Sequence, residues 1–294
     1  MCIPNMAEIG TFIFRIKIVL FVFVCLFCMI RQGYSQEGSA PEPVHAQNMK
    51  AFSDEDLLKA TQNPVADLIS IPIQNITNFR IGPHNHTDNA VSFQPVIPVA
   101  LSDEWLLVSR IILPVAWQPY PDHESGGQFG LGDLNPTVFL APKNPGSLIW
   151  GIGPAMVIPT ATGNILGSGK LCLGPSVVVL AQPGNWTVGA LVSNVWSVAG
   201  LNYRPTVNKM SLQYFISYNL KDDWYVTSSP ILAADWRAKS GDQWLVPFGG
   251  GFGKLVTIGS RPVDFMASGY ANVVKPSGGP SWQLNLQVTL LFPK

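Results

Sequence analysis

The stretch WQLNLQVTLLF at residues 282–292 decides the fold class, because its side chains alternate between two faces. One face carries Trp282, Leu284, Leu286, Val288, Leu290 and Phe292, and the other carries Gln283, Asn285, Gln287 and Thr289. This period of two predicts a β-strand with one apolar and one polar face. A tilted strand needs roughly 9–11 residues to cross a bilayer, so the length and the aromatic ends are typical of a membrane-spanning strand.

The composition of the whole chain agrees with a membrane surface. Of its 294 residues, 47% are hydrophobic and only 12% are charged, whereas about a quarter is usual for a soluble domain. The 18 basic residues are balanced by 18 acidic ones, and no cluster of Lys and Arg stands out. Nucleic acid is therefore not expected as a partner.

Residues 1–35 have the features of a secretory signal peptide. Arg15 and Lys17 precede an apolar run at 18–30, and GYS at 33–35 provides a small-x-small cleavage site. An uncleaved anchor is the alternative, but the run is short of the roughly 20 residues that a membrane helix needs. Residues 36–67 are expected to form a lead-in with a short helix at about 53–63, capped by Ser53 with Asp56 at the capping-box position.

Three of the four cysteines, Cys2, Cys25 and Cys28, fall in the predicted signal peptide. Cys172 is then alone in the mature chain, so neither a disulfide framework nor a cysteine metal site is expected. The fold must be stable for other reasons.

Twelve segments of strand length follow residue 67, and turn residues separate them. They lie at about 68–78, 90–101, 105–118, 133–142, 148–159, 170–182, 186–198, 207–219, 224–236, 243–254, 262–274 and 281–292. Their connections alternate between tight turns, as at 102–104 and 183–185, and longer loops, as at 119–132 and 161–169. An even number of strands with alternating short and long connections predicts an up-and-down antiparallel transmembrane β-barrel spanning 68–292.

Tryptophan lies at both ends of the predicted strands. Tight turns lead directly into Trp105, Trp186 and Trp224, and we place at the long-loop ends Trp117, Trp150, Trp196, Trp236, Trp244 and Trp282. With Phe292, these side chains predict the aromatic girdles of a barrel in a bilayer. The alternative is that they are core tryptophans of a secreted β-sandwich.

Proline argues against regular strands, because it cannot donate to a β-ladder. It falls inside the predicted strands at Pro72, Pro95, Pro98, Pro114, Pro136, Pro154, Pro175, Pro230 and Pro247. We therefore expect many local bulges or kinks. Alternation is also poor at 106–108 and 177–180, where both faces are apolar.

The polar faces identify candidate residues of the lumen. In the strand at 207–219 the polar face carries Ser211, Gln213, Ser217 and Asn219. The lumen candidates are Arg110, Gln213, Asp235, Asp264, Gln283, Asn285 and Gln287. Charged residues that face a lumen can narrow or polarise a pore, and the alternative for Asp235 is a position at the membrane interface.

Motifs for catalysis and metal binding are weak. His84 and His86 have the spacing of metal ligands, but no third ligand is placed beside them, and we expect a solvated loop. The segment GNILGSGK at 163–170 departs from a phosphate-binding loop at its first glycine and after its lysine. The mature histidines lie in probable loops or tails, so a catalytic triad has no evident base. No catalytic residue, metal or cofactor is predicted.

Several stretches together resemble one bacterial family. They are NPVADLIS (63–70), QPVIP (94–98), GLGDLNP (130–136), PTAT (159–162), LGSGK (166–170) and PFGGG (247–251). In these stretches the chain is similar to the MetA-pathway-of-phenol-degradation proteins, which are proposed outer-membrane transporters sometimes labelled neuromedin U. The resemblance implies an outer-membrane barrel of a Gram-negative bacterium that passes small hydrophobic or aromatic compounds. It implies no catalytic residue.

The expected function is therefore passive passage of small, neutral or hydrophobic molecules through a barrel partly obstructed by the helix at 53–63. The expected partners are the lipid bilayer, the solute and the outer-membrane assembly machinery. Two alternatives stay open, a non-conducting structural or adhesive barrel and an outer-membrane hydrolase that uses His123.

Overall fold

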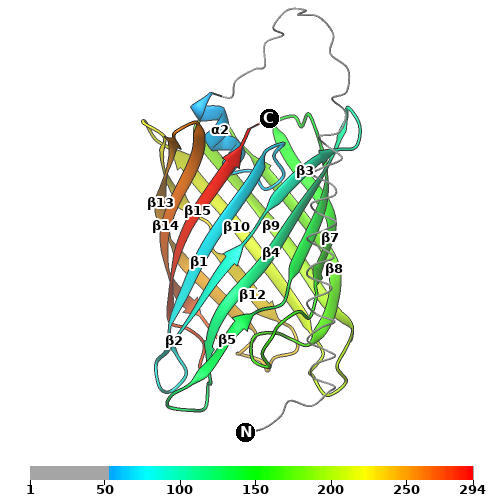
Figure 1. Cartoon of the computed structure of the whole chain (residues 1–294), viewed down its shortest axis with the longest axis vertical. Helices are drawn as coiled ribbons and strands as arrows, with labels where there is room; N and C mark the ends of the chain where they lie inside the picture. Colours follow the sequence, from blue (N-terminus) through cyan, green and yellow to red (C-terminus); the bar gives the residue numbers. More distant parts are fainter. Residues whose placement is uncertain (1–52, 294) are drawn as a thin grey trace, which may run out of the picture. The chain divides into compact units, whose positions relative to one another are not determined.

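A single closed antiparallel β-barrel forms the wall of the molecule in our computed structural model, which describes residues 53–293 (Figure 1). Each wall strand pairs with its neighbours in the sequence, and the ring closes where β1 (Ile69–Ile81) pairs with β15 (Trp282–Phe292). Fifteen strand segments make twelve wall strands, because three of the wall strands are interrupted once. The predicted fold class is confirmed. The predicted signal peptide, 1–35, and most of the lead-in lie outside the described residues.

The strand bounds agree closely with the predicted ranges. The uninterrupted strands are β1, β4 (Trp105–Pro119), β7 (Leu148–Val157), β8 (Lys170–Ala181), β9 (Trp186–Gly200), β10 (Asn208–Asn219), β13 (Trp244–Ile258), β14 (Arg261–Val274) and β15. The interrupted ones are β2 (His86–Phe93) with β3 (Val96–Ala100), β5 (Gly127–Leu131) with β6 (Asn135–Pro142), and β11 (Trp224–Ser228) with β12 (Ile231–Asp235). The expectation of a loop over 119–132 was wrong in part, because β5 pairs with the end of β4 and lengthens the wall.

Proline disturbs the wall at fewer places than expected. Pro95 and Pro230 lie in two of the three interruptions, and the register shifts between Val246 and Pro247. The other six prolines in the predicted strands keep a regular register, and Pro154 lies directly opposite Pro175. Because Pro154 and Pro175 face each other, their missing donors fall at the same point of the wall, and the rest of the β7–β8 ladder is regular.

The two ends of the barrel differ (Figure 1). Tight connections join β3 to β4, β6 to β7, β8 to β9, β10 to β11 and β13 to β14, and β1 begins and β15 ends at this same end. The opposite end carries the longer connections, including those at 120–126, 158–169, 201–207 and 236–243. We call them the tight-turn end and the long-loop end.

The outer surface of the wall is apolar. Its most exposed large side chains include Phe129, Phe248 and Phe252, with 73%, 67% and 56% of their surface exposed. Alternate residues face outward, so the inward ones enclose the core. No helix in residues 53–293 has the length and the apolar content to cross a membrane.

Candidate functional site: the lumen of the barrel

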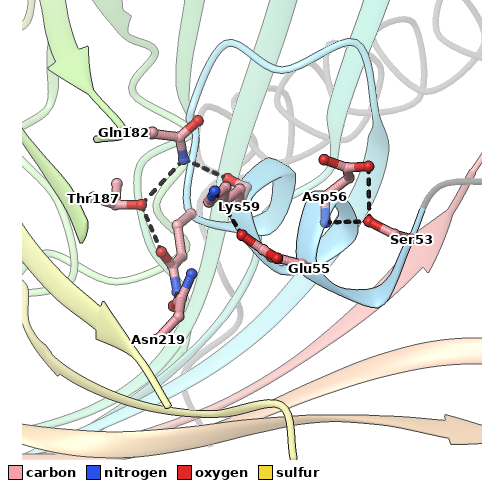
Figure 2. A network of polar contacts seen from close by, with 8 residues as sticks. Ser53, Glu55, Asp56, Lys59, Gln182, Thr187 and Asn219 are labelled. Atoms are coloured by element: carbon pink, nitrogen blue, oxygen red, sulfur yellow. Dashed lines mark hydrogen bonds and ion pairs between the residues drawn. The ribbon is translucent and has the colours of Figure 1, made fainter. Parts of the chain in front are cut away.

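A short segment before β1 packs against the inner wall at the tight-turn end of the barrel. It consists of helix α2 (Asp54–Thr61) and the residues up to Leu68, and we call 53–68 the plug. Ser53 caps the helix, since its hydroxyl accepts a hydrogen bond of 3.1 Å from the backbone N–H of Asp56, as predicted (Figure 2). The helix ends at Thr61, slightly earlier than the predicted residue 63.

The plug is held to the inner wall by apolar contacts. Leu57 and Leu58 of α2 pack in a buried cluster with Leu68, Tyr225, Leu255 and Leu291. Val65 enters a second cluster with Leu106, Val108, Phe139, Ala141, Val178, Leu180, Leu191 and Phe215. This explains why alternation is poor at 106–108 and 177–180. There the inward face packs on the plug, while the outward face belongs to the apolar surface of the wall.

Four polar side chains fasten the plug where α2 ends (Figure 2). The amide nitrogen of Gln62 donates to Asn219 over 2.7 Å, and its amide oxygen accepts from the Thr187 hydroxyl over 2.7 Å. Gln182 donates to the backbone carbonyl of Lys59 over 2.8 Å and to Thr187 over 3.1 Å. We call these residues the latch. Because both ends of the Gln62 amide are used, the latch fixes the orientation of its side chain.

Between the plug and the wall lies a cavity of about 160 Å³. Its lining side chains come from the plug and from strands all around the barrel. They include Leu68, Gln74, Gln94, Val96, Arg110, Gln213, Phe215, Tyr225, Asp264, Met266, Asn285 and Gln287. The cavity is therefore a part of the lumen with mixed polar and apolar walls, and Arg110 and Asp264 are the charged residues among those that line it.

A chain of hydrogen-bonded side chains runs along one side of this cavity. The Arg110 guanidinium donates to the Gln94 amide oxygen over 2.8 Å, and the Gln94 amide nitrogen donates to Gln74 over 2.8 Å. Val96, which pairs with Arg110 in the register of β3 and β4, lies beside the chain. The chain crosses three neighbouring wall strands, so it fixes the place of the Arg110 charge.

The other charged group of the cavity is paired. Both carboxylate oxygens of Asp264 lie 3.0 Å from the Tyr225 hydroxyl, which donates to them. Tyr225 also belongs to the apolar cluster under α2. The buried carboxylate is thus stabilised by the residue that supports the plug.

Some buried polar atoms of the inner wall have no hydrogen-bond partner in the described structure. They are Asn219 Nδ2, Ser268 Oγ, Asn272 Oδ1 and Asn285 Oδ1. Asn285, 7% exposed, lines the cavity, and Ser268, 3% exposed, pairs with it in the register of β14 and β15. Buried polar groups are usually satisfied, so these four atoms are exceptions on the inner wall.

The register places the other lumen candidates on the inner face as well. Gln213 donates over 2.9 Å to the Ser229 hydroxyl. Gln287 donates to Thr289, and Gln283 pairs with Tyr270. Asp235 lies toward the long-loop end, 3.5 Å from the Lys209 ammonium. Arg110, Gln213, Asp264, Asn285 and Gln287 line the one cavity, and Asp235 and Gln283 do not.

The aromatic side chains at the ends of the strands point outward. Trp105, Trp186, Trp224 and Phe292 lie at the tight-turn end, and Trp117, Trp196, Trp236, Trp244 and Trp282 lie near the long-loop end. Trp150 was placed wrongly, because β7 begins at the tight-turn end, where the Trp150 ring lies 6.0 Å from that of Trp105. Several rings meet in pairs, such as Trp236 with Trp244 at 5.5 Å.

The loop at 158–169 is bound to the long-loop end of the barrel. The Asp133 carboxylate accepts from the backbone N–H groups of Ala161 and Ser168 over 3.2 and 2.7 Å. Arg204 donates to the backbone carbonyls of Asn164, Gly167 and Ser168. The motif at 163–170 is therefore a loop held by one acid and one base. The sequence contained no signal for the pairing of this loop with Arg204.

The described histidines lie together at the long-loop end. His86 Nε2 is 2.8 Å from the backbone carbonyl of His123, and the rings of His84 and His86 are 5.6 Å apart. No group of three or more potential metal ligands occurs among residues 53–293. The contact joins the first residue of β2 to the loop at 120–126.

Comparison with known proteins extends the fold assignment. No protein-family model and no curated protein sequence matches the chain. Among solved structures, the chain is similar to the COG4313 outer membrane channel from Pseudomonas putida F1, at 17% identity and a TM-score of 0.58, over 76% of this chain and 94% of that one. At this identity the likeness concerns the fold.

Two further solved barrels are similar to a lesser degree. The CymD monoaromatic hydrocarbon channel matches at 8% identity and a TM-score of 0.42, over 85% of this chain and 95% of that one. The outer membrane phospholipase A of Escherichia coli matches at 13% identity and a TM-score of 0.40, over 77% and 96%. These two matches carry no argument about function, which has to be made from the lumen of this chain.

Proposed function

We propose that the chain is an outer-membrane channel of a Gram-negative bacterium for small, neutral or hydrophobic molecules, aromatic ones included. The observation that carries the proposal is the cavity of about 160 Å³ inside the closed barrel, bounded by the plug. A structural barrel has no need for free space in its core, whereas a channel needs sites that a solute can enter and leave.

The apolar outer surface supports the membrane part of the proposal. Tryptophan rings at both ends of the wall fit the two interfaces of a bilayer. Bacterial barrels have short periplasmic turns and longer outer loops, so the tight-turn end and the plug would lie on the periplasmic side. The predicted signal peptide would direct export, and the assembly machinery would insert the barrel. The resemblance to the MetA-pathway family favours the same location.

The cavity lining supports the class of solute. Apart from Arg110 and Asp264, its residues are neutral, and Leu68, Val96, Phe215 and Met266 provide apolar contacts. A lining of this kind favours uncharged and weakly polar molecules over hydrated ions, which would lose their water at a cost. Nothing in the lumen suggests a catalytic role, and we propose transport in preference to hydrolysis.

A flux assay in liposomes tests the proposal. Purified full-length protein should pass small neutral aromatic solutes such as benzyl alcohol, and a variant lacking 53–66 should pass them faster and also conduct ions. The deletion removes Leu57, Leu58 and Val65 from their clusters and opens the tight-turn end. If neither protein passes neutral solutes or ions, the channel proposal is wrong.

The closed plug favours one competing function, a non-conducting structural or adhesive barrel. In that case the wild-type protein would be impermeable, and only the deletion variant would conduct. Comparison of the two proteins in the same liposomes therefore separates the candidates. Release of fatty acid from lipid, lost on His123→Ala, would instead indicate the hydrolase.

A further inference from the structure

The Arg110 guanidinium is a half-buried cation on the wall of the lumen cavity, and no acidic side chain among residues 53–293 forms an ion pair with it. Two ion pairs occur among residues 53–293, Lys59 with Glu55 and Lys209 with Asp235, and neither involves Arg110. Its hydrogen bond to Gln94 uses one of five N–H donors. An opposite charge stabilises a cation on the wall of a cavity, so the remaining N–H donors of Arg110 favour an anionic ligand.

We propose that the lumen cavity binds a small organic monocarboxylate, with Arg110 holding its carboxylate. The inference rests on the proposed channel function and goes beyond its neutral solutes, because it adds organic anions whose charge Arg110 compensates. The planar guanidinium offers parallel N–H donors that match the two oxygens of a carboxylate. The chain of hydrogen bonds to Gln94 and Gln74 keeps the guanidinium in one place on the wall.

The cavity also suits the body of such a molecule. Val96 lies beside Arg110, and Phe215 and Met266 line the same space, so an apolar ring next to the carboxylate would lie against apolar side chains. A cavity of about 160 Å³ has room for a small molecule such as one with a single aromatic ring.

The positions of Arg110 and Asp264 favour one orientation of the ligand in the cavity. Asp264 lines the same space, and its carboxylate is taken up by the Tyr225 hydroxyl at 3.0 Å. A ligand carboxylate would be attracted by the Arg110 guanidinium, whereas the Tyr225 hydroxyl already donates to Asp264. We therefore expect one orientation, in which the carboxylate contacts β3 and β4 and the ring points away from them.

Calorimetric titration of purified full-length protein in a nonionic detergent at neutral pH tests the site. The probes are benzoate, the neutral benzamide of nearly the same shape, and inorganic phosphate. Benzoate should bind at least about tenfold more tightly than benzamide, which corresponds to about 1.4 kcal/mol. Phosphate should bind more weakly than benzoate, because it lacks the ring.

Substitutions locate the effect. Arg110→Gln should remove the preference for benzoate. Arg110→Lys should keep a part of it, because the positive charge remains but the planar guanidinium with its two parallel N–H donors is lost. The matched control is Arg261→Gln, which removes the same charge at the tight-turn end, where Arg261 lies over the Phe292 ring. The control should keep the full preference.

Several results would overturn the carboxylate site. Equal binding of benzoate and benzamide by the wild-type protein would do so without any variant, and so would an unchanged preference in Arg110→Gln. Phosphate binding as tight as that of benzoate would show a plain anion site. Flux of benzamide into liposomes distinguishes the two proposals. If benzamide passes but the protein does not bind benzoate more tightly than benzamide, only the carboxylate site is refuted. If benzamide does not pass, the channel is refuted.

Discussion

At the scale of single residues, glycines allow wall strands to come closer than side chains would permit. A methyl group on Gly174 of β8 would collide with the carbonyl oxygen of Asn194 in β9, and one on Gly153 of β7 would meet that of Val138. At Gly269 of β14 nothing lies within 4 Å of the same position. The glycines of the wall are therefore not equivalent.

We predict that Gly174→Ala lowers the unfolding free energy by about 1–3 kcal/mol, because the backbone of two strands must move apart. Gly269→Ala is the matched control in open space and should leave the unfolding free energy unchanged or slightly higher. Urea unfolding in lipid vesicles measures both. Equal effects of the two substitutions would contradict the close approach at Gly174.

The pair of Tyr225 and Asp264 gives a second prediction for single residues. Tyr225→Phe leaves the buried carboxylate without its donor and should lower the unfolding free energy by about 1–3 kcal/mol. The control is Tyr203→Phe, in the loop at 201–207, where the side chain is 78% exposed. Adding Asp264→Asn to Tyr225→Phe should recover a part of the loss, because a neutral amide is less costly to bury. If it recovers none, the charge is not the cause.

At the scale of elements, the latch and the plug behave as one unit. The helix α2 has eight residues, too few to be stable alone in water, so its order depends on the clusters and the latch. Gln62 links the end of α2 to β9 through Thr187 and to β10 through Asn219. These bonds attach the plug to the wall at Gln62, directly after the end of α2.

We predict that Gln62→Ala raises the open probability of the channel several-fold, since each lost hydrogen bond is worth about 0.5–1.5 kcal/mol. Single-channel recording in planar bilayers measures it. Glu55→Gln on the same helix breaks only the solvent-exposed pair with Lys59 and should not change the openings. An unchanged open probability in Gln62→Ala would show that the latch does not limit opening.

The loop at 158–169 is a second element with a definite attachment. Asp133→Asn weakens its bonds to the backbone of Ala161 and Ser168, and we predict faster proteolytic cleavage between residues 162 and 169. Asp103→Asn, in a tight connection at the other end of the barrel, is the control and should not change the cleavage rate. Equal rates in wild type and Asp133→Asn would mean that Arg204 alone suffices to hold the loop.

At the scale of the whole molecule, segments of strand length separated by turn residues were enough to predict the number of strands. Strands with a polar inner face, such as 282–292, were the clearest, whereas Val178 and Leu106 gave no alternation because their inward face packs on the plug. That contact joins residues far apart in the chain, so no local pattern could report it. The cavity likewise arises only when β4, β10 and β14 meet around one space.

The arrangement of the whole barrel predicts where its tryptophans lie in a bilayer. Their rings are outward and near the two ends, so lipids brominated close to the headgroup should quench the fluorescence more strongly than lipids brominated at the chain end. A soluble sandwich would show no quenching by either lipid. Stronger quenching at the chain end would place the tryptophans at the membrane centre and contradict the girdles.

Cys172 is fully buried on the inner face of β8, so the reactivity of its thiol reports opening of the barrel. It is the one cysteine in residues 53–293, so a thiol reagent has a single target there. The rate at which that thiol is alkylated would record how often the wall or the plug admits a molecule of the reagent's size. The native chain therefore reports the rate of its own opening without an engineered label.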